Sequence, residues 1–151
     1  MNWTECSDAF HKDGSLRDLY AHGTTARDWD TFLAFLTSSP YKMEYTRDGE
    51  SEPIPADAAT VFADREHCHN LIIRLGKLGV CCHFFIPEEI ELDIDPREVS
   101  SQVELDAVMK FMSDVGATLR HDIILTEENG PEYIWFRYSH EDGQMHYRKD
   151  S

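Results

Sequence analysis

The sequence predicts an α+β fold, in which two main helices pack on a mainly antiparallel sheet. Three observations lead to this prediction: two segments repeat apolar residues at helical spacing, about seven short runs favour strands, and glycine-containing turns join many of these runs. The 151 residues contain no repeat, low-complexity tract or linker, so we expect a single domain over residues 1–151.

The first main helix is predicted to begin after Thr25, whose hydroxyl is followed three residues later by the carboxylate of Asp28, the spacing of a capping box. Pro40 stops the helix, because the residue before a proline disfavours helical backbone. A shorter helix is expected over Asp57–Asp64, with Asp57 as its N-cap.

The second main helix is predicted between Ser101 and Gly116. Ser101 would cap this helix, Glu104 would complete a second capping box, and Gly116 suits the position just past the helix end. Its buried stripe would consist of Leu105, Val108, Met109, Met112 and Val115.

A central hairpin is predicted from two apolar, β-favouring runs, Leu71–Leu75 and Val80–Ile86, which flank the sequence Gly-Lys-Leu-Gly. This connection would place Leu75 opposite Val80, and the second run is apolar enough for a strand covered on both faces. Further strands are expected at residues 16–21, 41–46, 90–95, 122–126, 132–138 and 144–148. The core is expected to contain Trp29, Phe32, Leu36, Leu71, Ile73, Val80, Cys82, Phe84, Leu105, Val108 and Met112.

Composition narrows the classes of partner. The net charge of −15 argues against nucleic acid and against an anionic membrane surface, but it allows a basic protein partner. No apolar run approaches the ~20 residues of a membrane span, and the N-terminal residues lack the features of a signal peptide. We therefore expect a cytoplasmic protein with reduced cysteines and no cofactor; the residues specify no homo-oligomeric state.

Two clusters of histidine and cysteine suggest zinc ligands at first. They are His67-Cys68-His69 and Cys81-Cys82-His83. Their spacing matches no zinc motif, and the predicted hairpin register would hold the two clusters at different heights. We expect buried structural cysteines and no metal site.

An acidic segment stands out after the central hairpin, with six carboxylates within eleven residues: Glu88, Glu89, Glu91, Asp93, Asp95 and Glu98. Strand geometry places three of them on one face about 6.5–7 Å apart. Three interpretations compete: a charged strand that protects a sheet edge, a surface for a basic partner, and catalytic carboxylates or a cation site. Exposed Tyr133 or Trp135 beside this segment would favour the second interpretation, because aromatic side chains anchor interfaces.

Three blocks of the chain resemble a group of small, acidic, uncharacterised bacterial proteins of the type that act as immunity partners of secreted toxins. The blocks are SLRDLYAHGTTARDW at 15–29, CHFFIPEEIELDIDPRE at 82–98 and ILTEENGPE at 124–132. The resemblance implies binding rather than catalysis and carries no catalytic residues. The expected function is a non-catalytic binding protein whose acidic face engages a basic protein. The alternatives are a small hydrolase with paired carboxylates and a purely structural or regulatory protein.

Overall fold

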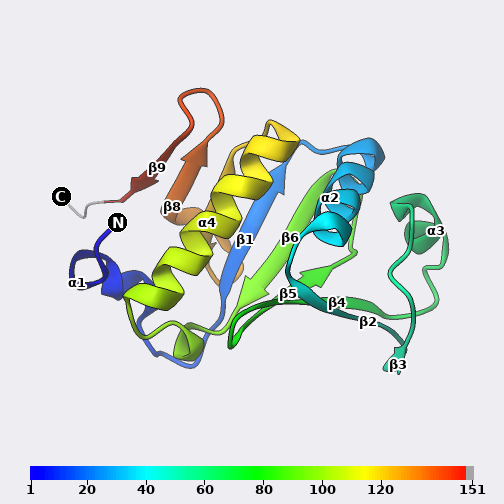
Figure 1. Ribbon diagram of the computed structural model, residues 1–151, viewed down its shortest axis with the longest axis horizontal. Helices are drawn as coiled ribbons and strands as arrows, with labels where there is room; N and C mark the ends of the chain where they lie inside the picture. Colours follow the sequence, from blue (N-terminus) through cyan, green and yellow to red (C-terminus); the bar gives the residue numbers. More distant parts are fainter. Residues whose placement is uncertain (149–151) are drawn as a thin grey trace.

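The computed structural model describes residues 1–148, which form an α+β fold with nine antiparallel strands in one sheet and four α-helices (Figure 1). The helices are α1 (Trp3–Cys6), α2 (Ala26–Ser38), α3 (Ala58–Ala63) and α4 (Gln102–Leu119), with 3-10 turns η1 (Ser7–Phe10) and η2 (Pro96–Glu98). The strands are β1 (Arg17–His22), β2 (Lys42–Arg47), β3 (Glu50–Ser51), β4 (His69–Leu75), β5 (Leu78–His83), β6 (Glu89–Ile94), β7 (Ile123–Glu127), β8 (Gly130–Ser139) and β9 (Gln144–Tyr147).

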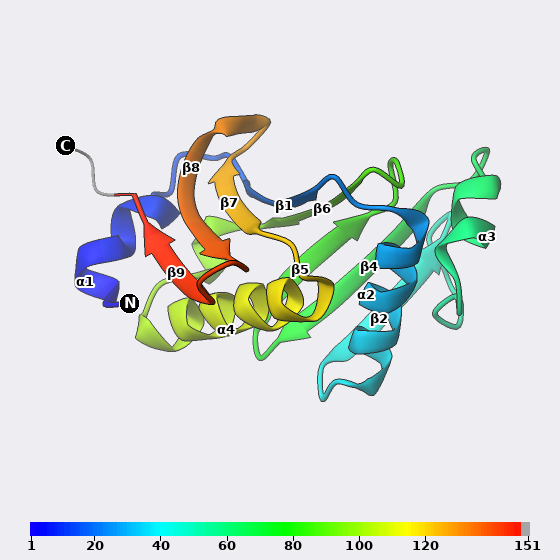
Figure 2. The same cartoon turned by 90° about the horizontal axis from the view of Figure 1, so that it is seen from above.

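The sheet is covered on one face by α2 and α4, of which α4 lies below the strands in Figure 2. Its strand order is β3-β2-β4-β5-β6-β1-β7-β8-β9. In β4, β5 and β6 every second residue is buried, and the cross-strand register aligns these buried residues on the helix-covered face, as in the row Leu71, Cys82, Leu92 and Leu19. We call the opposite face of β4, β5, β6 and β1 the open face.

The predicted start of α2 is confirmed. Thr25 and Asp28 form the reciprocal capping box, and Ser39 ends the helix directly before Pro40. The predicted N-cap of α3 is also confirmed, because the Asp57 side chain accepts a hydrogen bond from the backbone N–H of Thr60. The expected core residues are buried with one exception, since Phe84 is only half-buried.

The two ends of α4 differ from the prediction. Ser101 precedes the helix, but its hydroxyl bonds the Glu104 carboxylate and makes no bond to the helix backbone, so the expected capping box is absent. The helix continues past Gly116 to Leu119, and Arg120 takes the left-handed conformation at its end. Gly116 is needed inside the helix because a Cβ atom there would lie 2.2 Å from Cδ1 of Tyr138.

The central hairpin is confirmed, but its predicted register is wrong by two residues. Leu75 lies opposite Leu78, and Val80 lies opposite Ile73. The connection is the two-residue turn Gly76-Lys77, in which Gly76 has a φ of +66°. Glycine at the first central position is what a tight type II′ hairpin turn requires, so the second glycine of the motif is free to join the strand.

The acidic strand β6 is not at the edge of the sheet. It lies between β5 and β1, in the middle of the nine strands. The interpretation of its carboxylates as protection of a sheet edge is therefore wrong. The edge strands are β3 and β9, both short.

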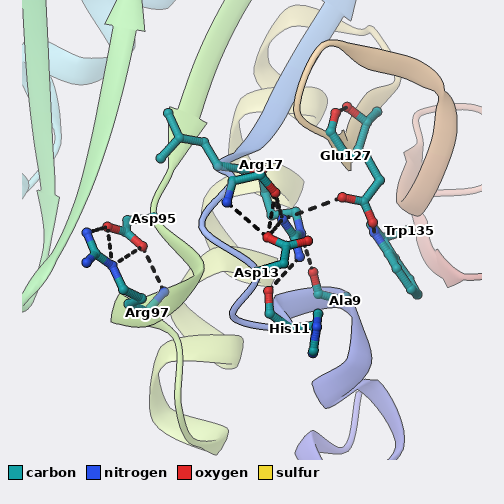
Figure 3. A network of polar contacts seen from close by, with 11 residues as sticks. Ala9, His11, Asp13, Arg17, Asp95, Arg97, Glu127 and Trp135 are labelled. Carbon is teal, nitrogen blue, oxygen red and sulfur yellow. Dashed lines mark hydrogen bonds and ion pairs between the residues drawn. The ribbon is translucent and has the colours of Figure 1, made fainter.

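The N-terminal segment is held by one buried side chain, Arg17 in β1, which is fully buried (Figure 3). Its guanidinium donates to the carbonyl oxygens of Ala9 (Nε, 2.7 Å), His11 (Nη2, 2.8 Å) and Leu16 (Nη1, 3.0 Å). It also lies 3.5 Å from a carboxylate oxygen of Glu127 in β7. One cation therefore ties the segment before β1 to two neighbouring strands.

Candidate functional site

A cluster of ionisable side chains lies on the open face where β5, β6 and β1 meet. Glu91 is the cross-strand neighbour of both His83 in β5 and Tyr20 in β1. Asp93, two residues after Glu91 in β6, is the cross-strand neighbour of Asp18 in β1. We call these five residues the open-face cluster. The period-two side-chain alternation of the strands brings them to the same side of the sheet.

Tyr20 connects two carboxyl groups of the cluster. Its hydroxyl lies 3.1 Å from Oδ2 of Asp18 and 3.2 Å from Oε1 of Glu91. A phenol has one proton, so Tyr20 donates to one carboxylate at a time, and the other contact is favourable when that carboxyl group is itself protonated. Burial and the two neighbouring carboxylates raise the pKa of Tyr20, so this hydroxyl stays a donor.

Asp18 is the most buried carboxylate of the cluster, with 4% of its surface exposed. Burial raises its pKa, although hydrogen bonds from the backbone N–H of Asn129 (2.7 Å) and from Tyr20 favour the charged form. Burial also raises the pKa of Glu91, and the Asp18 and Glu89 carboxylates contribute to that shift. The open-face cluster therefore holds negative charge at a cost in free energy.

His83 and Asp93 form the second pair of the cluster. Nε2 of His83 lies 2.5 Å from Oδ2 of Asp93, and this hydrogen bond raises the pKa of His83. Both side chains are about a quarter exposed or less, with exposed fractions of 26% and 18%. Cys81 follows on the same face, where burial raises the pKa of its thiol and so disfavours the reactive thiolate.

The remaining acidic residues of the segment have separate partners. Glu89 lies 3.5 Å from Nε2 of His22, and Glu88 is exposed. Asp95 is paired with the exposed Arg97 at 2.7 Å, next to the network of Figure 3. Asp95 therefore lies in a local pair with its own cation, while Glu91 and Asp93 share the open-face cluster.

The aromatic residues expected beside the acidic segment lie elsewhere. Tyr133 is 55% exposed and Trp135 is half-buried, but both are in β8, and β1 and β7 separate β8 from β6. Trp135 donates its indole N–H to Glu127, the carboxylate that also lies near Arg17 (Figure 3). The structure does not bring these aromatics together with the open-face cluster.

Sequence reasoning missed an exposed apolar pair directly after β5. The strand ends at His83, and Phe85 and Ile86 are 62% and 45% exposed, whereas a strand covered on both faces had been expected up to Ile86. That prediction is wrong because only Phe84 turns inward, against Trp29. Pro87 so soon after the run was the one sequence signal of an irregular ending.

The other histidine-rich segment is occupied by local hydrogen bonds. Nδ1 of His67 lies 2.5 Å from Oδ2 of Asp48, and Nε2 of His69 lies 3.0 Å from Oδ2 of Asp64. Within residues 1–148, no group of three or more His, Cys, Asp or Glu side chains is placed to hold a metal ion. All four cysteines are free thiols, and Cys68 is exposed, which contradicts the expectation that the cysteines are buried.

A shallow hollow of about 220 Å³ adjoins the open-face cluster. Its lining is Tyr20, His22, Asp122, Ile124, Pro131, Ile134 and Arg137, and it includes neither Glu91 nor Asp93. A hydrolase with paired carboxylates needs both groups to face one bound substrate. The hollow does not provide that arrangement, whereas the partly exposed Glu91 and Asp93 of the cluster can form charge-assisted hydrogen bonds to a cationic group brought by a partner.

Comparisons with protein family models, with curated proteins and with solved structures found no match to this chain. Among the described helices, none combines the length and the apolar character needed to cross a membrane.

Proposed function

We propose that this protein is a non-catalytic binding protein, of the immunity or inhibitor type, whose open face engages a basic protein partner. The observation that carries the proposal is the open-face cluster, in which Glu91 and Asp93 lie partly exposed beside the buried Asp18 on a face that none of the described helices covers. The net charge of −15 supports the same conclusion, because it favours encounter with a basic surface.

Cationic groups of a partner would relieve the electrostatic cost of the cluster. Asp18 and Glu91 have raised pKa values because burial and neighbouring carboxylates disfavour their ionisation. Asp18 is only 4% exposed, so a lysine or arginine of the partner reaches the partly exposed Glu91, stabilises its ionised form and lowers its pKa. Binding should therefore release protons and tighten as the pH rises through the raised pKa of Glu91.

The experiment compares capture of proteins from cells that encode this chain by the wild type and by two double variants. E91Q/D93N removes two charges from the open-face cluster with little change in side-chain shape. E50Q/E52Q removes two charges from exposed positions at and just past β3, at the far edge of the sheet, and serves as the matched control. Quantitative mass spectrometry identifies proteins that the wild type and the control retain and that E91Q/D93N loses.

The association rate of the identified protein is then measured at two salt concentrations. We expect E91Q/D93N to slow association, and we expect the wild-type rate to fall as salt increases, because steering by exposed charges is screened. A partner that binds E91Q/D93N and the wild type at equal rates, with equal dependence on salt, would show that this face is not the site.

A further inference from the structure

We infer that Phe85 and Ile86 form the apolar anchor of this interface and insert into an apolar pocket on the basic partner. The inference rests on the proposed function and adds the contact that supplies most of the affinity. Interfaces commonly combine a few buried aromatic or large apolar anchors with a charged rim that contributes mainly to rate and partner choice.

The first argument is exposure. Phe85 and Ile86 are adjacent in the chain and leave 62% and 45% of their surfaces in solvent. The neighbouring Phe84 is oriented differently. Its ring packs against Trp29 and Tyr45 at centroid distances of 5.1 and 6.2 Å. Two adjacent large apolar side chains in water favour burial by a partner.

The second argument is pre-organisation. The Phe85 ring is stacked on the imidazole of His83, with a centroid distance of 5.1 Å and an interplanar angle of 4°. His83 is in turn held by its hydrogen bond to Asp93. An aromatic side chain that is already held in one orientation loses little conformational entropy on binding, which favours affinity.

The backbone beyond the pair is also held. Thr24, just after β1, donates its hydroxyl to the carbonyl oxygen of Pro87 (2.7 Å) and its backbone N–H to that of Glu88 (3.0 Å). The segment from Phe85 to Glu88 is therefore fixed between His83 on one side and Thr24 on the other. A segment held in one conformation in this way can bind a partner with little rearrangement of its backbone.

The third argument is charge. The apolar pair is followed at once by Glu88 and Glu89, and the stacked His83 is the cross-strand neighbour of Glu91. A second copy of this chain would bring the same carboxylates face to face, since a two-fold interface joins identical patches. Repulsion between them disfavours a homodimer, so the occupant that fits is a basic protein surface with an apolar pocket.

The test uses a phage-displayed library of random 12-residue peptides, selected on the immobilised wild-type protein at low salt. A peptide synthesised from the enriched sequences is then titrated by fluorescence anisotropy against the wild type, Phe85→Ala and Tyr133→Ala. Tyr133→Ala is the matched control because it removes an exposed aromatic ring from β8. Circular dichroism establishes that each variant is folded, and Phe85→Leu is a second variant that keeps an apolar side chain.

We expect enriched peptides to combine apolar residues with lysine or arginine. Phe85→Ala should weaken their binding at least tenfold at every salt concentration, Phe85→Leu less, and Tyr133→Ala less than twofold. The E88K/E89K variant should weaken binding at low salt and reduce its salt dependence.

Three results would overturn the inference. The first is that selection on the wild type enriches no peptides beyond those enriched on the F85A/I86A variant, and the second is that Phe85→Ala changes the dissociation constant of the peptide by less than twofold. The third is that sedimentation shows a dimer of the wild type that Phe85→Ala dissociates. If E88K/E89K weakens the binding of basic peptides and Phe85→Ala does not, the anchor is refuted and the proposed function still stands. Peptides without basic residues, insensitive to salt, would count against both.

Discussion

Replacing Arg17 by methionine is expected to destabilise the protein strongly. The change keeps the apolar stem and removes a fully buried guanidinium that donates to three backbone carbonyl groups. The carbonyl oxygen of Ala9 would lose its bond from Arg17 in a residue with no exposed surface, which costs about 1–3 kcal/mol. The oxygens of His11 and Leu16, in residues that are exposed or partly exposed, would regain water at a smaller cost.

Two carboxylates near the guanidinium moderate the effect. Asp13 and Glu127 each lie 3.5 Å from Arg17 but remain about one-third exposed, so water solvates them when Arg17 is removed. We therefore expect a total loss of about 3 kcal/mol, at the lower end of the range for breaking a buried ion pair. For a chain of this size, that loss lowers the melting temperature by roughly 6–12 °C.

The assay is urea unfolding followed by tryptophan fluorescence, with Lys12→Met as the control. Lys12 is exposed in the same N-terminal segment, so its replacement removes the same charge and should change the free energy of unfolding by less than about 0.5 kcal/mol. Limited proteolysis of Arg17→Met should also cut before β1 at concentrations of denaturant where the wild type resists. A loss below about 1 kcal/mol would refute the view that this cation holds the segment.

Three further predictions concern single positions. Gly116→Ala should lose about 1–3 kcal/mol in thermal unfolding, despite the better helix propensity of alanine, because the new Cβ would meet the Tyr138 ring; unchanged or increased stability would contradict this packing. Asp18→Asn should raise stability at neutral pH. The pKa of Asp18 is raised in the folded state, so its contribution to stability is fully present below the unfolded pKa near 3.9 and is lost as the pH rises through the folded-state pKa. A gain that persists unchanged below pH 3.9 in denaturation experiments would count against that explanation. Thr25→Ala should cost about 1 kcal/mol through loss of the capping box with Asp28, measured by urea unfolding, and an effect near zero would mean that the cap is dispensable.

Local signals in the sequence predicted local structure well. The capping pair Thr25 and Asp28 and the N-cap Asp57 are confirmed, because a cap depends on residues within one turn. The α+β class with a large antiparallel sheet followed from the alternation of helical and strand periodicity and is confirmed.

Two errors were local, the capping box at Ser101 and the register of the central hairpin, and the others arose where a distant contact decided the outcome. Gly116 looked like a helix end, but Tyr138, more than twenty residues later, needs the space that glycine leaves. The position of β6 in the sheet depends on β1, a partner some seventy residues earlier that no local pattern identifies. The open-face cluster was therefore predictable only in part: Glu91 and Asp93 were found from their alternation, whereas Asp18, Tyr20 and His83 join them through strand pairing.

The place of β1 in the sheet also sets an order for folding. Strands β4, β5 and β6 are consecutive in the chain and pair as a meander, and so do β7, β8 and β9. Among the strands of residues 1–148, only β1 joins the two meanders, by pairing with β6 on one side and with β7 on the other. During synthesis β1 leaves the ribosome first, yet its second partner follows roughly 100 residues later, so closing this long loop is a late and entropically costly step. Until then β1, once paired with β6, and the β7 side of the second meander present unpaired edges, and a chain that lacked β1 would leave β6 and β7 open to association with other chains.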